Sequence, residues 1–358
     1  MEGNEVYRFM LIWFSVSLSL CYCYAIGRTI PKGKTRLSFL LPIVCFFLYL
    51  PLNLSTIHLC GITSFFVAWL ANFKLLLFAF GKGPLSSHSS ITSLPRFLAV
   101  ACLPIKIQDK PCPKSQNGET PPPRLSKLEP QKSPINYATK GTLLAVLVRV
   151  YDYKESMHPK ILLFLYCFHI YVFLEMILAM VAFLARAVLG LELEPQFNEP
   201  YLSTSLQDFW GRRWNLMVSR ILRPTVYEPT IDIGTRVIGR KWAPIPAIWS
   251  TFFVSALMHE LLFYYLSRLR PTWEVARFFI LHGFLLTAEI ALKKACGSRW
   301  RLPRMISRPF TVGFVIVTSF WLFFPQLLNH CRAEVRAFEE YAAVGEFIRI
   351  WSRGLLVR

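Results

Sequence analysis

Long uninterrupted apolar runs are the feature that most limits how this chain can fold. Seven of them are about 20 residues long, which is the length that a helix needs to cross the hydrocarbon core of a bilayer. A soluble domain of 358 residues, of which 54% are hydrophobic, would not gather its apolar residues into such runs. The runs are Phe9–Gly27, Leu37–Leu54, Leu59–Phe80, Ile161–Leu184, Ile245–Leu266, Val275–Leu292 and Thr311–Leu328.

These runs predict an all-α, polytopic integral membrane protein, because only helices and closed barrels satisfy every backbone polar group inside a membrane. Either of two shorter apolar pieces, Leu98–Ile107 and Leu143–Val150, could add a crossing, so we expect about eight transmembrane helices. No internal repeat is visible, and the length suits one membrane domain over residues 1–358. Within it we expect a proline-rich cytosolic loop at residues 108–134, and a loop with an interfacial helix at residues 191–244.

Basic residues outnumber acidic ones, with 40 Lys and Arg against 21 Asp and Glu and a formal net charge of +19. They lie between the apolar runs, where they mark cytosolic loops and attract anionic lipid or substrate, so no nucleic-acid partner is expected. The first such loop, from Arg28 to Arg36, places the N-terminus in the lumen by the positive-inside rule. The nine cysteines lie mostly inside apolar runs without metal-ligand spacing, which indicates neither a disulfide framework nor a metal site.

A polar segment precedes the fifth apolar run and has the sequence Ser205-Leu206-Gln207-Asp208-Phe209-Trp210-Gly211-Arg212-Arg213-Trp214-Asn215. If residues 209–223 form one helix, an apolar stripe that includes Trp210 and Trp214 lies opposite a basic face that includes Arg212. Asn215 then lies at the margin between the two faces. This pattern is typical of an interfacial helix whose arginines face lipid phosphates. It equally places Asn215 where the polar head and the apolar chain of a substrate would meet.

His259 lies well inside the fifth apolar run. A lone histidine in an apolar helix is usually structural, but an ionisable group inside a membrane is costly to bury and is a functional candidate. Desolvation disfavours the imidazolium, so a buried histidine stays neutral and can act as a base, with Ser255 one turn earlier to orient it. His259-Glu260 begins the zinc-protease pattern H-E-x-x-H, but the fifth position is Phe263, so no metal is expected.

Further ionisable residues fall inside apolar runs, where each needs water or a partner, among them Lys74, Glu175, His282 and Glu289. Lys74, near the end of the third run, is expected to snorkel to the membrane interface, with an ion pair to Glu175 as the alternative. His282 and Glu289 are seven residues apart and therefore on one helix face, where they could form a structural pair.

Together these features indicate a membrane enzyme with a neutral histidine base, a nearby asparagine and many cytosolic cations. The cations suit a phosphate-rich cosubstrate such as a coenzyme A thioester, and the apolar spans suit a lipid alcohol, so the reaction would be O-acylation. A different interpretation is a proton-coupled membrane transporter in which His259 binds or relays the proton. The absence of an internal repeat and the arginine-rich motif beside a histidine-bearing span speak against a transporter.

The polar segment, together with Met258-His259-Glu260, resembles the plant wax synthases of the membrane-bound O-acyltransferase superfamily. Further similar stretches are Pro195–Tyr201, Trp69–Phe80, Trp273-Glu274-Val275 and Leu281-His282-Gly283, so the resemblance covers nearly the whole chain. It implies a multi-pass enzyme of the endoplasmic reticulum membrane that transfers an acyl group from acyl-CoA to a hydroxyl, with no cofactor besides this cosubstrate.

The resemblance also assigns roles to single residues. His259 would take the proton of the acceptor hydroxyl, and Asn215 would position or polarise a reactant. Binding or positioning of acyl-CoA would fall to Asp208, Trp210, Arg212, Arg213, Trp214 and Ser255. We expect a long-chain fatty alcohol as the acceptor and a wax ester as the product. Sterol O-acyltransferases and diacylglycerol acetyltransferases would share the motifs, and the oligomeric state is left open.

Overall fold

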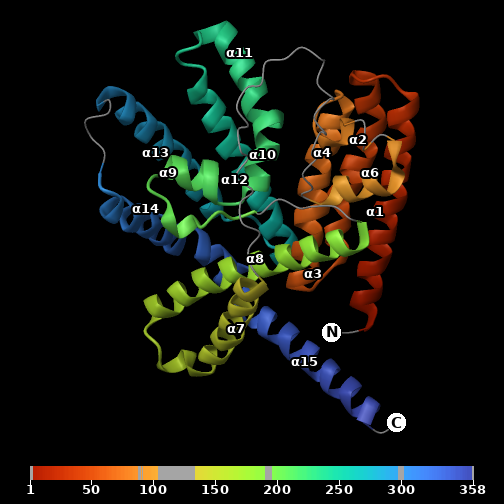
Figure 1. Cartoon of the computed structure of the whole chain (residues 1–358), viewed down its shortest axis with the longest axis vertical. Helices are drawn as coiled ribbons and strands as arrows, with labels where there is room; N and C mark the ends of the chain where they lie inside the picture. Colours follow the sequence, from red (N-terminus) through yellow and green to blue (C-terminus); the bar gives the residue numbers. More distant parts are fainter. Residues whose placement is uncertain are drawn as a thin grey trace, which may run out of the picture. The chain divides into compact units, whose positions relative to one another are not determined.

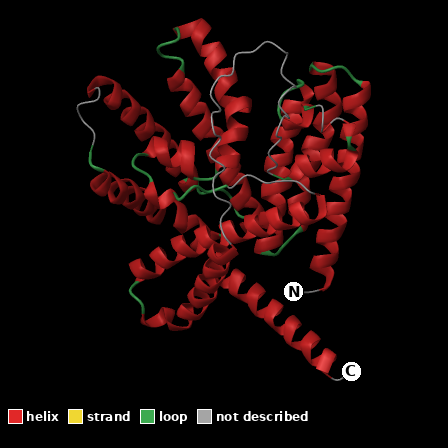
Figure 2. Cartoon of the chain, in the orientation of Figure 1, coloured by secondary structure: helices red, strands yellow, loops and turns green. Residues whose placement is uncertain are grey.

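The computed structural model describes residues 3–87, 90, 92–103, 134–189, 196–296 and 302–356. These residues form helices and connecting loops and no strand (Figure 1; Figure 2), so the prediction of an all-α chain is confirmed for them. The predicted proline-rich loop at 108–134 lies outside the described residues except for its last position, and so do residues 104–107, 191–195 and 297–301.

The chain divides into two compact units, of which one comprises Met1–Pro104 and Phe197–Arg358, and the other Ile105–Gln196. The second unit contains α7 (Pro134–Val150), η4 (Tyr151–Ser156) and α8 (Pro159–Leu189). The first part of the larger unit contains α1 (Gly3–Thr29), α2 (Lys34–Tyr49), η1 (Leu50–Asn53), α3 (Ile57–Thr63), η2 (Ser64–Ala71), α4 (Asn72–Ala79), η3 (Pro84–Ser86) and α6 (Leu94–Cys102).

The second part of the larger unit carries the polar segment and the histidine. It contains η5 (Pro200–Leu202), α9 (Leu206–Asp208), η6 (Phe209–Arg213), α10 (Leu216–Leu222), η7 (Arg223–Tyr227), α11 (Glu228–Ile238), α12 (Pro244–Ser267), α13 (Glu274–Cys296), α14 (Arg304–Thr318), η9 (Ser319–Phe323), η10 (Gln326–His330) and α15 (Ala333–Leu356). The elements η2, η6, η7, η9 and η10 are π-helical, with a wider turn than an α-helix.

Seven helical stretches among the described residues are long and apolar enough to span a bilayer, and the prediction of a polytopic membrane protein is confirmed. Each matches one of the seven predicted runs. Five of the stretches enclose the predicted run, and the other two end one residue before it does. They are Asn4–Thr29, Lys34–Asn53, Ile57–Ala79, Pro159–Ala187, Pro244–Ser267, Glu274–Cys296 and Arg304–His330. The short apolar piece at Leu98 falls in α6, whose 9 residues are too few for a crossing.

The helices α12 and α13 pack side by side in the larger unit (Figure 1). Gly283 of α13 lets them approach, because a Cβ atom at this position would lie only 3.0 Å from the Cβ atom of Phe252 on α12. Small residues at such contacts are the usual means by which membrane helices come close enough to pack. The close approach holds the histidine-bearing helix against α13, and the polar segment is hydrogen-bonded to α13 as well.

The carboxylate of Glu260 links α12 to the start of α13 and to η10. Its Oε1 atom accepts a hydrogen bond of 3.0 Å from the backbone N–H of Ala276, and its Oε2 atom accepts one of 2.9 Å from Gln326 Nε2. Gln326 Oε1 in turn accepts from the N–H of Val275 at 3.4 Å. First-turn amides have no partner within their own helix, so Glu260 and Gln326 together satisfy two of them for α13.

One prediction about a buried charge is wrong. Lys74 is only 3% exposed and does not snorkel, because its Nζ atom donates to the carbonyl oxygens of Val100 at 2.5 Å and Leu103 at 2.6 Å. These carbonyls close the C-terminal end of α6, where they have no partner within the helix. Glu175 forms an ion pair of 2.6 Å with Lys140 inside the smaller unit.

We predict that Glu260→Ala destabilises the protein by about 2 kcal/mol, because it leaves the Ala276 amide and the Gln326 side chain buried without an acceptor. Glu260→Gln keeps an acceptor oxygen and is the matched variant, with a smaller expected loss. The measurement is the thermal unfolding midpoint of the purified protein in detergent micelles. Equal midpoints for wild type and Glu260→Ala would contradict this role.

Candidate active site

The prediction of a single helix over residues 209–223 is wrong. Helix α9 passes into the π-helix η6, the chain is then extended at Trp214 (φ −97°, ψ 127°), and α10 starts after Asn215. Asn215 has a left-handed backbone conformation with φ 40° and ψ 62°. Asparagine tolerates this region better than most residues, so the helix breaks where the sequence offers it.

Two side chains of α13 hold the polar segment in place. Glu289 accepts hydrogen bonds from the backbone N–H groups of Leu206 at 2.7 Å and Gln207 at 3.4 Å, at the start of α9. His282 accepts a hydrogen bond of 3.0 Å from the indole Nε1 of Trp210. The predicted pairing of His282 with Glu289 is therefore wrong, because seven residues of helix separate them by about 10 Å. Instead, both residues anchor the same segment.

The hydrogen bonds of His282 define its tautomer. An indole Nε1 can only donate, so Nδ1 of His282 must carry the lone pair. The other ring nitrogen, Nε2, lies 2.9 Å from the Thr318 hydroxyl, whose own proton is directed to backbone carbonyls of α14. His282 is thus a fully buried neutral imidazole that donates from Nε2 to the Thr318 hydroxyl. Its Nδ1 atom holds the Trp210 indole in place.

The charged residues of the motif brace the turn around the helix break. Asp208 Oδ2 pairs with Arg213 Nε at 2.8 Å and accepts from the N–H of Thr204 at 3.2 Å. Arg213 Nη1 donates to the carbonyl oxygens of Asn198 at 3.2 Å and Glu199 at 3.3 Å. These bonds tie the two ends of the loop together before the chain reaches Asn215.

His259 of α12 is oriented by its own helix. Its Nδ1 atom lies 2.8 Å from the backbone carbonyl oxygen of Ser255, which can only accept, so Nδ1 carries the proton. The backbone of Ser255 therefore provides the orientation that the sequence led us to expect from this residue. The second ring nitrogen, Nε2, keeps the lone pair and is the atom that could accept a proton.

Aromatic rings surround the imidazole of His259. The ring centroids of Trp69, Phe279 and Phe323 lie 5.1 Å, 4.3 Å and 6.3 Å from that of His259. Trp69 belongs to the π-helix η2 and Phe323 to the π-helix η9, so each wider helical turn contributes a ring to this wall. Such surroundings are largely apolar and leave the imidazole half-buried at the cavity wall.

His259 and Asn215 line the same cavity, which has a volume of about 100 Å³. The polar segment and α10 form one side of it, and α12 with Phe279 of α13 forms the other. Its lining residues are Trp210, Trp214, Asn215, Val218, Ser219, Leu222, Thr251, Phe252, Ser255, His259 and Phe279. The structure therefore brings together five of the predicted site residues, namely Trp210, Trp214, Asn215, Ser255 and His259.

The side chain of Asn215 contains a buried oxygen, Oδ1, that has no hydrogen-bond partner among the described residues. Leaving a buried acceptor unpaired costs about 1–3 kcal/mol, so such an atom at a cavity wall suits a ligand that supplies the missing donor. Its position follows from the left-handed turn at Asn215, which lets the side chain leave the helix direction.

The remaining predicted site residues lie outside the cavity lining. Asp208 and Arg213 are engaged with each other and with the loop backbone, and Arg212 is exposed. Sequence reasoning did not find Trp69, Phe279 or Phe323 as neighbours of His259. No spacing rule links residues so far apart along the chain, and only the packing of the helices reveals them.

Comparison with known proteins agrees with this geometry. Residues 193–281, which contain both Asn215 and His259, match the model of the "Membrane bound O-acyl transferase family". The chain is 49% identical to acyl-CoA–sterol O-acyltransferase 1 of Arabidopsis thaliana over 95% of either protein. It is 44% identical to the long-chain-alcohol O-fatty-acyltransferase of Simmondsia chinensis, over 99% of this chain and 98% of that protein.

A further relative is the probable long-chain-alcohol O-fatty-acyltransferase 1 of Arabidopsis thaliana, which is 45% identical over 91% of this chain and 93% of that protein. Such identity along nearly the entire length excludes the possibility that only a short motif is shared between unrelated folds. Together with the seven spans and the matched segment, it shows that the chain belongs to the membrane-bound O-acyltransferase family, in its plant wax synthase branch.

Proposed function

We propose that this protein is an acyl-CoA-dependent O-acyltransferase that esterifies long-chain fatty alcohols to wax esters in the endoplasmic reticulum membrane. One observation carries the proposal: a histidine whose Nε2 keeps its lone pair shares a cavity with an asparagine whose buried oxygen lacks a partner. The relatives support the substrate class, because the names of two of them specify a long-chain alcohol and a fatty acyl group.

In the proposed reaction, the alcohol oxygen attacks the thioester carbonyl carbon while Nε2 of His259 takes the hydroxyl proton. The C–S bond then breaks, and the departing thiolate receives that proton from the imidazolium. Acyl-CoA and alcohol give ester and free CoA, so the histidine returns to its neutral form without an acyl-enzyme or a further cofactor. The amide nitrogen of Asn215 would donate to the developing oxyanion, and its unpaired oxygen would accept from a substrate donor.

The placement of the polar segment suits a donor that arrives from the cytosol. Glu289, which anchors the start of α9, also pairs with Lys293 at 2.6 Å, at the edge of the basic stretch that we predict to be cytosolic. We propose that acyl-CoA approaches from this side, with its phosphates near exposed cations such as Arg212 and its thioester directed to the cavity.

The size of the cavity favours a linear acceptor. A volume of about 100 Å³ is well below the 300–1,000 Å³ typical of sites for drug-sized ligands. We propose that the end of an alkyl chain with its hydroxyl enters this space more readily than the fused rings of a sterol. A sterol is nevertheless the second candidate acceptor, because a relative with 49% identity is a sterol O-acyltransferase.

We predict that His259→Ala lowers ester formation by about 10²–10⁴-fold, the usual contribution of a general base. The assay is the incorporation of labelled acyl-CoA into wax ester by microsomes supplied with a fatty alcohol. His330→Ala is the matched control, since this histidine is exposed and lies outside the cavity lining. An unchanged rate for His259→Ala at equal membrane abundance would exclude His259 as the base.

Two substitutions distinguish the role of the Asn215 side-chain amide from the role of its left-handed backbone conformation. Asn215→Ala removes the amide and strains the left-handed turn, whereas Asn215→Gly removes the amide and relaxes the turn. If the amide stabilises the oxyanion, both variants lose about 10²–10³-fold in rate in the same microsomal assay. A glycine variant as active as wild type would instead assign Asn215 a purely conformational role.

The acceptor is tested by expression in yeast that lacks its own neutral-lipid acyltransferases. We expect wax esters to accumulate when the cells are fed fatty alcohols. Sterol esters without wax esters would support the second candidate, and acetylated glycerides would point to diacylglycerol. If the protein is inserted but forms no ester with any of these acceptors, the acyltransferase proposal fails and a transporter becomes the better hypothesis.

A further inference from the structure

A second cavity lies apart from the one at His259. It has a volume of about 860 Å³ and lies where the C-terminal end of α12 meets η1, the first turns of α1 and the start of α15. Helix α12 thus reaches from the candidate active site, midway along it, to this second cavity at its end. The proposed acyl transfer assigns no role to the second cavity.

Three arginines line this cavity, and none of its described lining residues is acidic. They are Arg8 of α1, Arg268 just after α12 and Arg336 of α15. All three belong to the side of the membrane that we predict to be lumenal, where cations are normally depleted. Three arginines around one cavity on that side need a physical reason.

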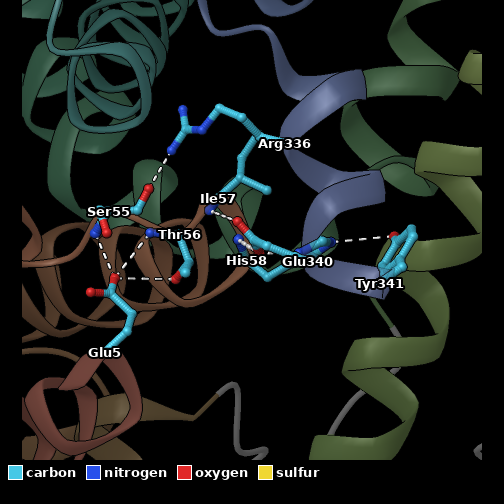
Figure 3. A network of polar contacts seen from close by, with 8 residues as sticks. All are labelled: Glu5, Ser55, Thr56, Ile57, His58, Arg336, Glu340 and Tyr341. Atoms are coloured by element: carbon cyan, nitrogen blue, oxygen red, sulfur yellow. Dashed lines mark hydrogen bonds and ion pairs between the residues drawn. The ribbon is translucent and has the colours of Figure 1, made fainter. Parts of the chain in front are cut away.

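Two carboxylates lie near the cavity, but both are used by the backbone (Figure 3). Glu5 accepts from the N–H groups of Ser55 at 2.6 Å and Thr56 at 3.0 Å. Glu340 accepts from the N–H groups of Ile57 at 2.5 Å and His58 at 3.2 Å. Neither carboxylate forms an ion pair with one of the three arginines among the described residues.

Glu340 is held in its charged form where it stands. Burial acts to raise the pKa of this carboxyl, but hydrogen bonds from the His58 side chain and from the backbone amides outweigh it, so the pKa lies below its usual value. Glu340 therefore remains bound to the N-terminal turn of α3, where it complements the free amides and the helix dipole. The carboxylate of Glu340 therefore binds this turn and does not neutralise the arginines of the cavity.

The arginines keep donors for a ligand. Arg268 uses only Nη2 in the described contacts, with the carbonyl oxygens of Pro51 and Leu54, both at 2.9 Å. Arg336 donates through Nη1 and Nη2 to backbone carbonyls of residues 55, 266 and 331. Arg8 is exposed and makes none of the hydrogen bonds or ion pairs of the described residues. Of the five N–H donors of each guanidinium, at least two therefore remain in every case.

The rest of the wall is largely apolar. Leu11, Ile12, Phe46, Leu50 and Leu52 line the cavity beside the arginines. A small soluble anion would leave this surface uncovered, whereas an amphiphile places its charged head on the guanidinium groups and its chain along the apolar residues. The volume lies within the 300–1,000 Å³ range of pockets that enclose a ligand of considerable size.

We propose that this cavity binds an anionic amphiphile, with a phosphate or carboxylate head on Arg8, Arg268 and Arg336 and an acyl chain against α1 and η1. Two sources share this chemistry, a bilayer phospholipid with a phosphomonoester head and a free fatty acid. Because the cavity lies apart from His259 and Asn215, binding there does not depend on the proposed acyl transfer.

Binding is tested with the purified full-length protein in neutral detergent. The probes are dioleoyl phosphatidic acid, oleate and zwitterionic dioleoyl phosphatidylcholine, and the readout is the rise of the thermal unfolding midpoint with lipid concentration, which gives an apparent Kd. We expect tighter binding of at least one anionic lipid than of phosphatidylcholine. Phosphatidic acid alone would identify the phospholipid source, and oleate alone the fatty acid.

The decisive variant is Arg8→Gln, since Arg8 supports no described backbone contact. Loss of a charge-assisted hydrogen bond should weaken the apparent Kd for the anionic lipid by about tenfold. Arg28→Gln is the matched control, because Arg28 is also exposed but lies at the opposite end of the same helix. Equal binding of all three lipids, or equal weakening by Arg8→Gln and Arg28→Gln, would overturn the proposal.

Discussion

The candidate site depends on the hydrogen bond from the Trp210 indole to His282. The carboxylate of Glu289, two helical turns further along α13, supports it by binding the start of α9. Together they fix a short polar segment against a membrane helix that is itself packed on α12. Once the indole and the α9 amides are held there, the chain has to break its helix at Trp214 to continue into α10. That break delivers Asn215 to the cavity wall that faces His259.

Among the described residues, several buried or half-buried charges are satisfied mainly by backbone groups. Lys74 closes the carbonyl end of α6, Glu260 binds an amide at the start of α13, and Glu5 and Glu340 bind amides at the start of α3. Helix ends carry unpaired donors and acceptors and, in an apolar environment, are the polar partners nearest at hand. A charge placed there avoids the desolvation of a second ion.

The sequence predicted the elements whose signal is local. Hydropathy located the seven spans, because a run of about 20 apolar residues has few alternatives, and one histidine inside such a run marked His259. The helical wheel failed at Trp214, since it assumes regular dihedral angles and the anchors on α13 impose others. The predictions for Lys74 and His282 failed for a related reason, because the groups that they bind lie on other helices and are brought near only by packing.

The surroundings of His259 also limit how the proposed reaction can proceed. Many catalytic histidines have a carboxylate on the second ring nitrogen, which stabilises the imidazolium. The only carboxylate adjacent in sequence, Glu260, is bound to the start of α13, and Nδ1 of His259 meets the neutral carbonyl of Ser255. With a neutral carbonyl on Nδ1 in place of a carboxylate, an imidazolium at His259 would be stabilised less than in such sites. The proton must therefore pass quickly from the alcohol to the departing thiolate, and both substrates have to be in place before it moves.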